Sequence, residues 1–166
     1  MQQTIDVQTG EVRAEQGEVV LQSNAIGSCV VIVAHDAAKN IGAIAHIMLP
    51  GSAPANKKPA EKTKYAANSI VAIVSQMGRL GSKKEDIEVA LVGAGNVLNR
   101  KDDTICKDNI ESTLELLRKK HLKVSAQAVG GTNRRSVRLD VERGIVSYTE
   151  GNGAETQLWR TQKVTE

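Results

Sequence analysis

Two side chains in this sequence pair a nucleophile with a proton acceptor. Cys29 follows Gly27 and Ser28 at the start of an apolar run, and His46 lies seventeen residues later among aliphatic neighbours. A thiol beside an imidazole can form a thiolate–imidazolium pair that attacks acyl carbons. Backbone N–H groups near Ser28 and Cys29 would then hold the oxyanion. If the fold brings Cys29 and His46 together, the pattern predicts nucleophilic hydrolysis.

Each of these residues also has a purely structural interpretation. Free cysteine is among the most buried residue types, and a single histidine in an apolar strand commonly makes a structural hydrogen bond. The other candidates are weaker. His35 stands beside Asp36 in a polar turn and His121 at a charged helix end, so both are expected to be solvated. Cys106 is expected on a helix, as a structural thiol.

Metal and nucleotide chemistry are not predicted. Cys29 and His46 supply two ligands, whereas a zinc site needs three or four from the protein. The turn Gly93-Ala94-Gly95 follows a strand but lacks the third glycine or the Lys-Ser/Thr of nucleotide fingerprints, and Gly130-Gly131 lies between strands. Both are expected to be tight turns, and no cofactor is expected. The lysines between positions 57 and 64 indicate a solvated face. The alternative is that their positive charge steers an acidic partner.

The elements around the two candidates form a hairpin. Residues 19–21, 29–34 and 41–49 are β-branched or aliphatic runs bounded by polar or glycine residues, which predicts strands. The second and third of these runs are joined by a polar turn, so their strands should pair and bring Cys29 close to His46. Residues 51–61 contain two prolines and predict a mobile surface loop beside the site.

The rest of the chain alternates helices and strands. Helical spacing of apolar residues predicts helices over 63–80 and 104–120, and strands are expected at 88–92, 124–129, 137–141 and 145–148. Two helices cannot cover both faces of a doubly wound parallel sheet. The prediction is therefore an α/β fold, a two- or three-layer sandwich with mixed, largely antiparallel sheets and two main helices.

Composition limits the class of protein further. A chain of 166 residues predicts one domain, 1–166, with about 15 residues at each end peripheral. Three aromatic residues are too few for the stacking platforms of single-stranded nucleic-acid modules, and a charge of +3 with interspersed acids is no nucleic-acid footprint. The longest apolar run, 29–34, cannot span a bilayer, and the N-terminus does not resemble a signal peptide. We expect a soluble, cytoplasmic protein with free thiols, no nucleic-acid partner and no membrane insertion.

Several segments together resemble the CheD family of chemoreceptor glutamine deamidases. The Gly-Ser-Cys element and the His-x-Met-Leu-Pro element, at this separation, form a specific signature. The similarity extends over nearly the whole chain, through Ser23, Ile26–Val30, Ala45–Pro50, Lys64–Ala66, Asn109, Val129–Gly131 and Arg135–Val137. Departures are Ala25 in place of a usual glycine, Gly93–Asn96 in place of a Gly-Gly-Ala turn, and 126–128 where acidic residues are common.

The resemblance implies a Cys–His–Thr triad on a fold shared with bacterial toxin deamidases. Cys29 would be the nucleophile and His46 the general base and acid, with oxyanion support from Gly27 and Ser28. The family's threonine falls on Ser23, whose hydroxyl or backbone carbonyl would orient the imidazole.

The implied reaction converts glutamines of methyl-accepting chemotaxis receptors to glutamate and releases ammonia; hydrolysis of glutamyl methyl esters is also implied. The alternative is a regulatory binding module that stimulates the CheC-type chemotaxis phosphatase. A third interpretation is a domain whose cysteine and histidine are only structural.

Overall fold

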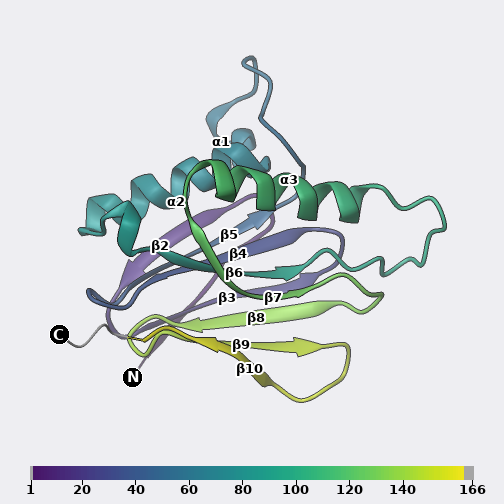
Figure 1. Ribbon diagram of the computed structural model, residues 1–166. Coiled ribbons are helices and arrows are strands. Elements are labelled where there is room, and N and C mark those ends of the chain that lie inside the picture. The colour runs from purple at the N-terminus through teal and green to yellow at the C-terminus, as the bar shows by residue number, and fades with distance from the viewer. Residues whose placement is uncertain (1, 163–166) are drawn as a thin grey trace.

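The computed structural model describes residues 2–162 and contains two five-stranded sheets and two long helices (Figure 1). One sheet has the order β1-β3-β8-β9-β10 and the other β2-β5-β4-β6-β7. The elements are β1 (Gln3–Asp6), β2 (Val12–Gln16), β3 (Val19–Ile26), β4 (Val30–Asp36), β5 (Ile41–Ile47), α1 (Pro59–Lys62), α2 (Ala66–Leu80), a 3-10 turn (Lys84–Asp86), β6 (Glu88–Gly93), α3 (Ile105–Lys119), β7 (Lys123–Val129), β8 (Arg135–Asp140), β9 (Ile145–Glu150) and β10 (Thr156–Arg160).

These elements stack in three layers. Helices α2 and α3 cover one face of the β2-β5-β4-β6-β7 sheet, and the other sheet lies against its opposite face (Figure 1). Only β1–β3 and β6–β7 pair in parallel among the described strands; the other pairs are antiparallel. The predicted α/β sandwich with mixed, largely antiparallel sheets and two main helices is confirmed.

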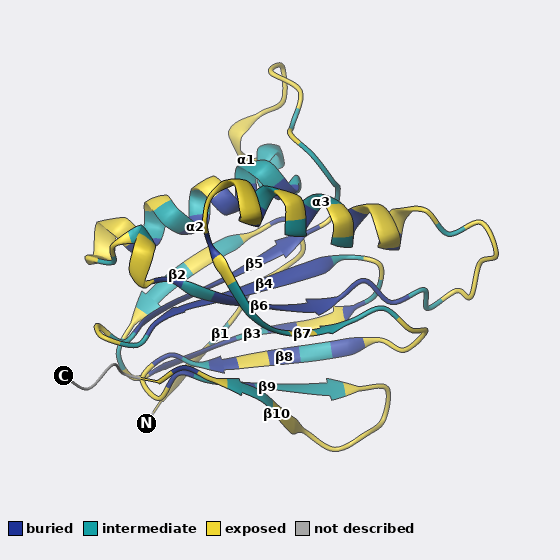
Figure 2. Ribbon diagram, viewed as in Figure 1, coloured by how far each residue is buried: buried dark blue, intermediate teal, exposed yellow. Residues whose placement is uncertain are grey.

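The central strands β4 and β5 are buried on both faces and separate two aliphatic cores (Figure 2). Side chains such as Ile32 and Ile47 face the helices, whereas Val31, Val33 and Ile44 face the second sheet. This follows from the two-residue period of a strand. Cys29 and His46 share the parity of Val31 and Ile44, so both belong to the layer between the sheets.

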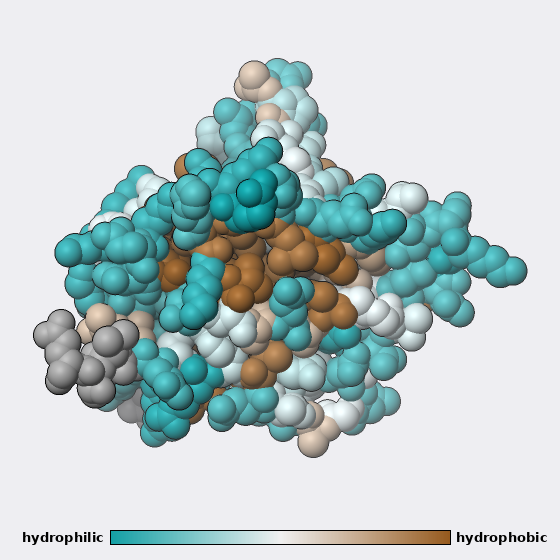
Figure 3. Space-filling model, viewed as in Figure 1, coloured by the Kyte–Doolittle hydropathy of each residue, from teal (hydrophilic) through white to brown (hydrophobic). Residues whose placement is uncertain are grey.

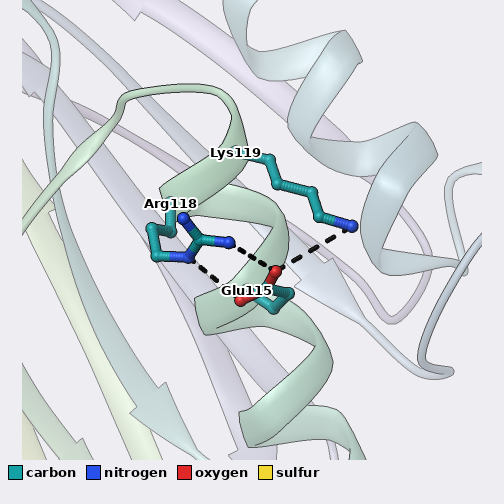
Figure 4. Close-up of polar contacts among 3 residues, drawn as sticks. All are labelled: Glu115, Arg118 and Lys119. Atoms are coloured by element: carbon teal, nitrogen blue, oxygen red, sulfur yellow. Dashed lines mark hydrogen bonds and ion pairs between the residues drawn. The ribbon is translucent and has the colours of Figure 1, made fainter.

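The helices are amphipathic, and their outer faces are hydrophilic. Glu115 on the exposed side of α3 accepts hydrogen bonds from Arg118 at 2.7 and 3.1 Å and lies 3.9 Å from Lys119 (Figure 4). In Figure 3, apolar side chains gather in a strip between α3 and the strands β6 and β7 beneath it. No helix within residues 2–162 is long and apolar enough to cross a bilayer.

The structure adds strands that the sequence analysis did not predict. The terminal segments expected to be peripheral form the edge strands β1, β2 and β10. Their sequences are polar and half-exposed, so they carry little of the apolar alternation that marks a strand. The chain between β1 and β2 also enters the interior, because Val7 is 3% exposed.

The expectation that His35 is solvated is wrong. This residue lies in β4 and is 1% exposed. Its Nε2 donates to the carbonyl of Val141 at 2.6 Å, and its Nδ1 lies 2.7 Å from the Thr161 hydroxyl. His121 is exposed in a turn, as expected.

Candidate active site

Ser23, Cys29 and His46 lie at one end of the layer between the two sheets. Ser23 belongs to β3 of one sheet, whereas His46 belongs to β5 of the other and Cys29 immediately precedes β4. Ser23 follows the buried Leu21 by two residues and therefore faces the same interior layer. The sandwich thus brings together the three residues that the sequence analysis singled out.

Ser23 and His46 form a buried hydrogen bond across the layer. The Ser23 hydroxyl lies 2.6 Å from His46 Nδ1 and donates to the carbonyl of Val7 at 2.7 Å. A hydroxyl has a single hydrogen, so once this is given to Val7 the serine oxygen must accept from Nδ1–H. That hydrogen bond selects the tautomer in which Nε2 is unprotonated and free to accept a proton.

Cys29 and His46 are diagonal neighbours on adjacent strands. His46 lies opposite Val31 in the β4–β5 register, and Cys29 precedes Val31 by two residues. Cβ atoms in this relation are about 7–8 Å apart or somewhat less. Within residues 2–162, the hydrogen bond of the His46 ring is to Ser23 and not to the thiol. Hydrogen bonds between catalytic groups often tighten only when substrate is bound.

A bulge in β3 shapes the chain between Ser23 and Cys29. The β3–β8 register shifts between Ser23 and Ile26, and Ala25 has a φ of 53°. The left-handed region costs an L-residue roughly 1–2 kcal/mol, which glycine avoids. This backbone geometry explains the glycine that the CheD resemblance leads one to expect at position 25.

The turn after β6 holds the backbone around the cysteine. Ala94 N–H donates to the Cys29 carbonyl at 2.7 Å, and Gly95 N–H donates to the Gly27 carbonyl at 2.9 Å. A Cβ at Gly93 would stand 2.5 Å from the Cys29 oxygen. This close approach requires a glycine, so the turn predicted at 93–95 has a defined structural role.

Arg135 ties that turn to its surroundings from inside the protein. Its side chain is 6% exposed, and Nη1 donates to the carbonyls of Gly93 at 3.0 Å and Gly130 at 2.8 Å. Nη2 forms an ion pair with Glu150 at 2.9 Å. The guanidinium therefore joins the ends of β6 and β7 to β9, behind the cysteine.

Burial keeps the candidate nucleophile and base neutral in the free protein. Burial raises the pKa of the Cys29 thiol above its ordinary value of 9.0. Burial also lowers the pKa of His46 below 6.5, partly offset by the Val7 carbonyl. Near neutral pH the pair is thus a thiol and an imidazole.

The surface beside the cysteine is open and partly apolar. A hollow of about 440 Å³ adjoins Gly27 and Ser28. It is lined by residues of the 95–106 segment and by Arg134, with none from the 51–61 loop. Leu98 and Ile105 are exposed at this hollow, and Met48, two residues after His46, is exposed as well. The backbone just before Cys29 therefore borders an open surface with exposed apolar side chains.

Cys106 differs from Cys29 in its setting. It lies on α3, as predicted, and is 5% exposed. Burial and the nearby Asp103 raise its pKa to about 11, so its thiolate is scarce at neutral pH.

Sequence reasoning missed the roles of several residues around the site. The Val7 carbonyl and the Arg135 guanidinium act through contacts between distant segments, which leave no local pattern. Asn109 did leave a signal, because it is a polar residue on the buried stripe of α3 that includes Cys106, Thr113 and Leu117.

The sequence comparisons point to one family. Residues 48–150 match the family model described as CheD chemotactic sensory transduction, a range that begins after His46. A relative from Chlorobium luteolum, named probable chemoreceptor glutamine deamidase CheD, is 35% identical over 91% of this chain and 75% of its own length. The chemoreceptor glutamine deamidase CheD of Thermotoga maritima is 30% identical over 88% of this chain and 91% of its own.

The solved structure of a Bacillus licheniformis hypothetical protein, YfiH, aligns with a TM-score of 0.41 and 15% identity over 70% of this chain and 51% of that one. The family model covers more than half of the present sequence, and the sequence relatives match most of it. The chain therefore belongs to the CheD family.

Proposed function

We propose that this protein is a chemoreceptor glutamine deamidase in which Cys29 is the nucleophile and His46 the general base and acid. The names of the CheD relatives support the reaction and the substrate class. The observation that carries the residue assignment is the bond from His46 Nδ1–H to Ser23. This hydrogen bond leaves Nε2 as the basic nitrogen of the ring. The imidazole belongs to the same interior face, and to the same strand ends, as the cysteine thiol.

The reaction begins with a neutral pair. As Cys29 Sγ forms a bond to the side-chain amide carbon of a glutamine, its proton passes to His46 Nε2 and the carbonyl electrons move to oxygen. The tetrahedral oxyanion then collapses. The amide nitrogen takes the proton from His46 and leaves as ammonia, so a thioester to Cys29 remains.

Hydrolysis of the thioester returns the enzyme to its starting state. His46 accepts a proton from a water molecule as the water oxygen attacks the thioester carbon. The Cys29 sulfur leaves and regains a proton from the imidazolium, and the product is glutamate. The net change is glutamine and water to glutamate and ammonia, and the scheme calls for no cofactor.

Two oxyanions form along this path, and backbone donors would stabilise both. In the described chain the N–H groups of Ser28 and Cys29 have no backbone partner, whereas the neighbouring carbonyls of Gly27 and Cys29 are both engaged. Free, fixed N–H groups beside a nucleophile are what an oxyanion hole requires. We assign this role to Ser28 and Cys29, with Gly27 supplying the turn.

The substrate glutamines would lie on the surface helices of cytoplasmic receptor domains, and we propose the cytoplasm as the location of the reaction. The open hollow beside Ser28 and the exposed Met48 and Leu98 fit a protein surface better than a small molecule. The glutamyl methyl esters and the CheC-type phosphatase partner stay predictions.

Mass spectrometry tests the proposal. The protein is incubated with a purified cytoplasmic receptor fragment, and tryptic peptides are examined for the exchange of amide NH₂ for OH, with ammonia measured in parallel. We expect conversion by the wild type and by Cys106→Ala, the matched thiol control, and none by Cys29→Ala or His46→Ala. Equal conversion by Cys29→Ala would overturn the assignment of the nucleophile. An inactive wild type on authentic receptor would overturn the proposed function.

A further inference from the structure

A buried amide joins the two segments that carry the nucleophile and the base. Asn109 on α3 is 0% exposed, and its Nδ2 donates to the carbonyl of Ser28 at 3.0 Å and to the carbonyl of Met48 at 3.3 Å. Ser28 immediately precedes Cys29, and Met48 follows His46 by two residues. One side chain thus contacts both strand ends at the site.

The orientation of this amide is fixed by its neighbours. Both groups that it meets are carbonyl oxygens, which can only accept, so the NH₂ and not the oxygen must face them. The Asn109 oxygen has no partner within residues 2–162. The two bonds that Nδ2 donates are therefore the hydrogen bonds that hold the Asn109 amide in place.

Asn109 contacts the two chain segments just beyond the end of the β4–β5 pairing. The β4–β5 pairing ends at Val30 and Ile47, so the carbonyls of Ser28 and Met48 lie beyond the last paired residues of these two strands. Met48 N–H has already turned away to the Lys64 carbonyl at 2.8 Å. The Asn109 amide bridges these two carbonyls in place of a backbone hydrogen bond between the strands.

The same contact sets the direction of one backbone donor. The Ser28 carbonyl and the Cys29 N–H belong to one planar trans peptide unit, in which the two groups point in opposite directions. When Asn109 holds the carbonyl toward α3, the Cys29 N–H must point away from the helix. That N–H is one of the groups assigned above to the oxyanion hole.

We propose that Asn109 is a positioning residue of the deamidase, which holds the Ser28–Cys29 peptide so that the Cys29 N–H points toward the oxyanion. The inference rests on the proposed function. A positioning role and a purely structural role of Asn109 lead to different expected rates for two reactions of the Cys29 thiol. Deamidation passes through an oxyanion, whereas alkylation by iodoacetamide displaces iodide from an sp³ carbon and forms none.

The test compares these two reactions in Asn109→Leu and in a matched control. Thr113→Val is the control, because Thr113 lies one turn further along α3, is buried, and has a hydroxyl without a partner in the described chain. Deamidation of the receptor fragment gives kcat and KM, and iodoacetamide gives the rate of Cys29 alkylation in a Cys106→Ala background. Circular dichroism confirms that each variant is folded at the assay temperature.

We expect kcat of Asn109→Leu to fall about 100-fold, the order of loss for one oxyanion donor, with little change in KM and in the alkylation rate. Thr113→Val should match the wild type. Should the leucine variant fail to fold, Asn109→Ser leaves room for water between the two carbonyls and should show the same split, with a smaller loss.

Two outcomes overturn the inference while leaving the deamidase function intact. The first is an active wild type with unchanged kcat in a folded Asn109 variant. The second is a parallel loss of deamidation and alkylation, which marks a general disturbance of the site. A wild type that alkylates at Cys29 but does not deamidate receptor overturns the proposed function itself.

Discussion

Replacement of Ser23 by threonine or valine isolates the hydroxyl that orients His46. Threonine and valine have nearly the same shape and add the same volume to a site that is 1% exposed, so any cost of overpacking is shared by both variants. They differ in whether an oxygen can accept from His46 Nδ1 at 2.6 Å and donate to the Val7 carbonyl at 2.7 Å.

The expected losses in stability and in kcat follow from these two hydrogen bonds. Each buried hydrogen bond contributes about 1 kcal/mol net, and a buried polar group left without a partner costs about 1–3 kcal/mol. Ser23→Val should therefore be about 1–3 kcal/mol less stable than Ser23→Thr. Loss of imidazole orientation should lower kcat by roughly 10- to 100-fold, which is about 1.4–2.7 kcal/mol in the barrier.

The assay measures kcat on the receptor fragment beside the urea midpoint of each variant. Ser23→Thr should stay close to the wild type, and Ser23→Val should show both losses. A pH profile adds a second readout. The hydroxyl accepts from Nδ1–H in both protonation states, but the hydrogen bond from the charged imidazolium is the stronger one. Loss of the hydroxyl therefore disfavours the imidazolium further and moves the acid limb of kcat/KM to lower pH. Full activity of Ser23→Val with an unchanged profile would refute the assignment of Ser23.

Three further predictions concern pH and backbone strain. The pKa of His46 lies below 6.5 and that of Cys29 above 9.0, so kcat/KM of the wild type should have an acid limb centred below the first value and an alkaline limb above the second. Because the folded state holds His46 neutral, its contribution to stability is fully present above pH 6.5 and is lost as the pH falls toward its lower folded pKa; urea midpoints that rise on acidification would contradict this. Ala25→Gly should stabilise the protein by about 0.5–1 kcal/mol, because relief of the left-handed φ of 53° exceeds the added chain entropy, whereas Ala72→Gly within α2 should destabilise it by about 1 kcal/mol. Equal losses in the two glycine variants would show that position 25 is not strained.

The hairpin that carries the site was predictable because its information is local. The β-branched run at 30–33 and the aliphatic run around His46 flank a polar turn, and the observed register places Val31 opposite His46. Once this register is known, the two-residue period of a strand puts Cys29 and His46 on a common face. Resemblance to the CheD family added Ser23, which by itself is one polar residue in a short strand.

The unpredicted features depend on contacts between distant parts of the chain. His35 looked like a turn residue, but its partners Val141 and Thr161 come from segments more than one hundred positions away. These partners satisfy both ring nitrogens and so permit burial. The edge strands β1 and β2 were missed for a related reason, since their pairing depends on β3 and β5 and not on their own hydrophobicity.

The central claim is that Cys29 forms a covalent bond with the substrate, and acid-quenched turnover tests it most directly. Wild type and Cys106→Ala are mixed with excess receptor fragment, stopped in acid during the first turnover, digested, and searched by mass spectrometry for a thioester-linked pair of peptides. If Cys29 is the nucleophile, the peptide containing Cys29 should carry the receptor glutamine peptide less one ammonia, in both proteins. Deamidation of receptor by Cys29→Ala at the wild-type rate, with no adduct on Cys29 in the wild type, would contradict it.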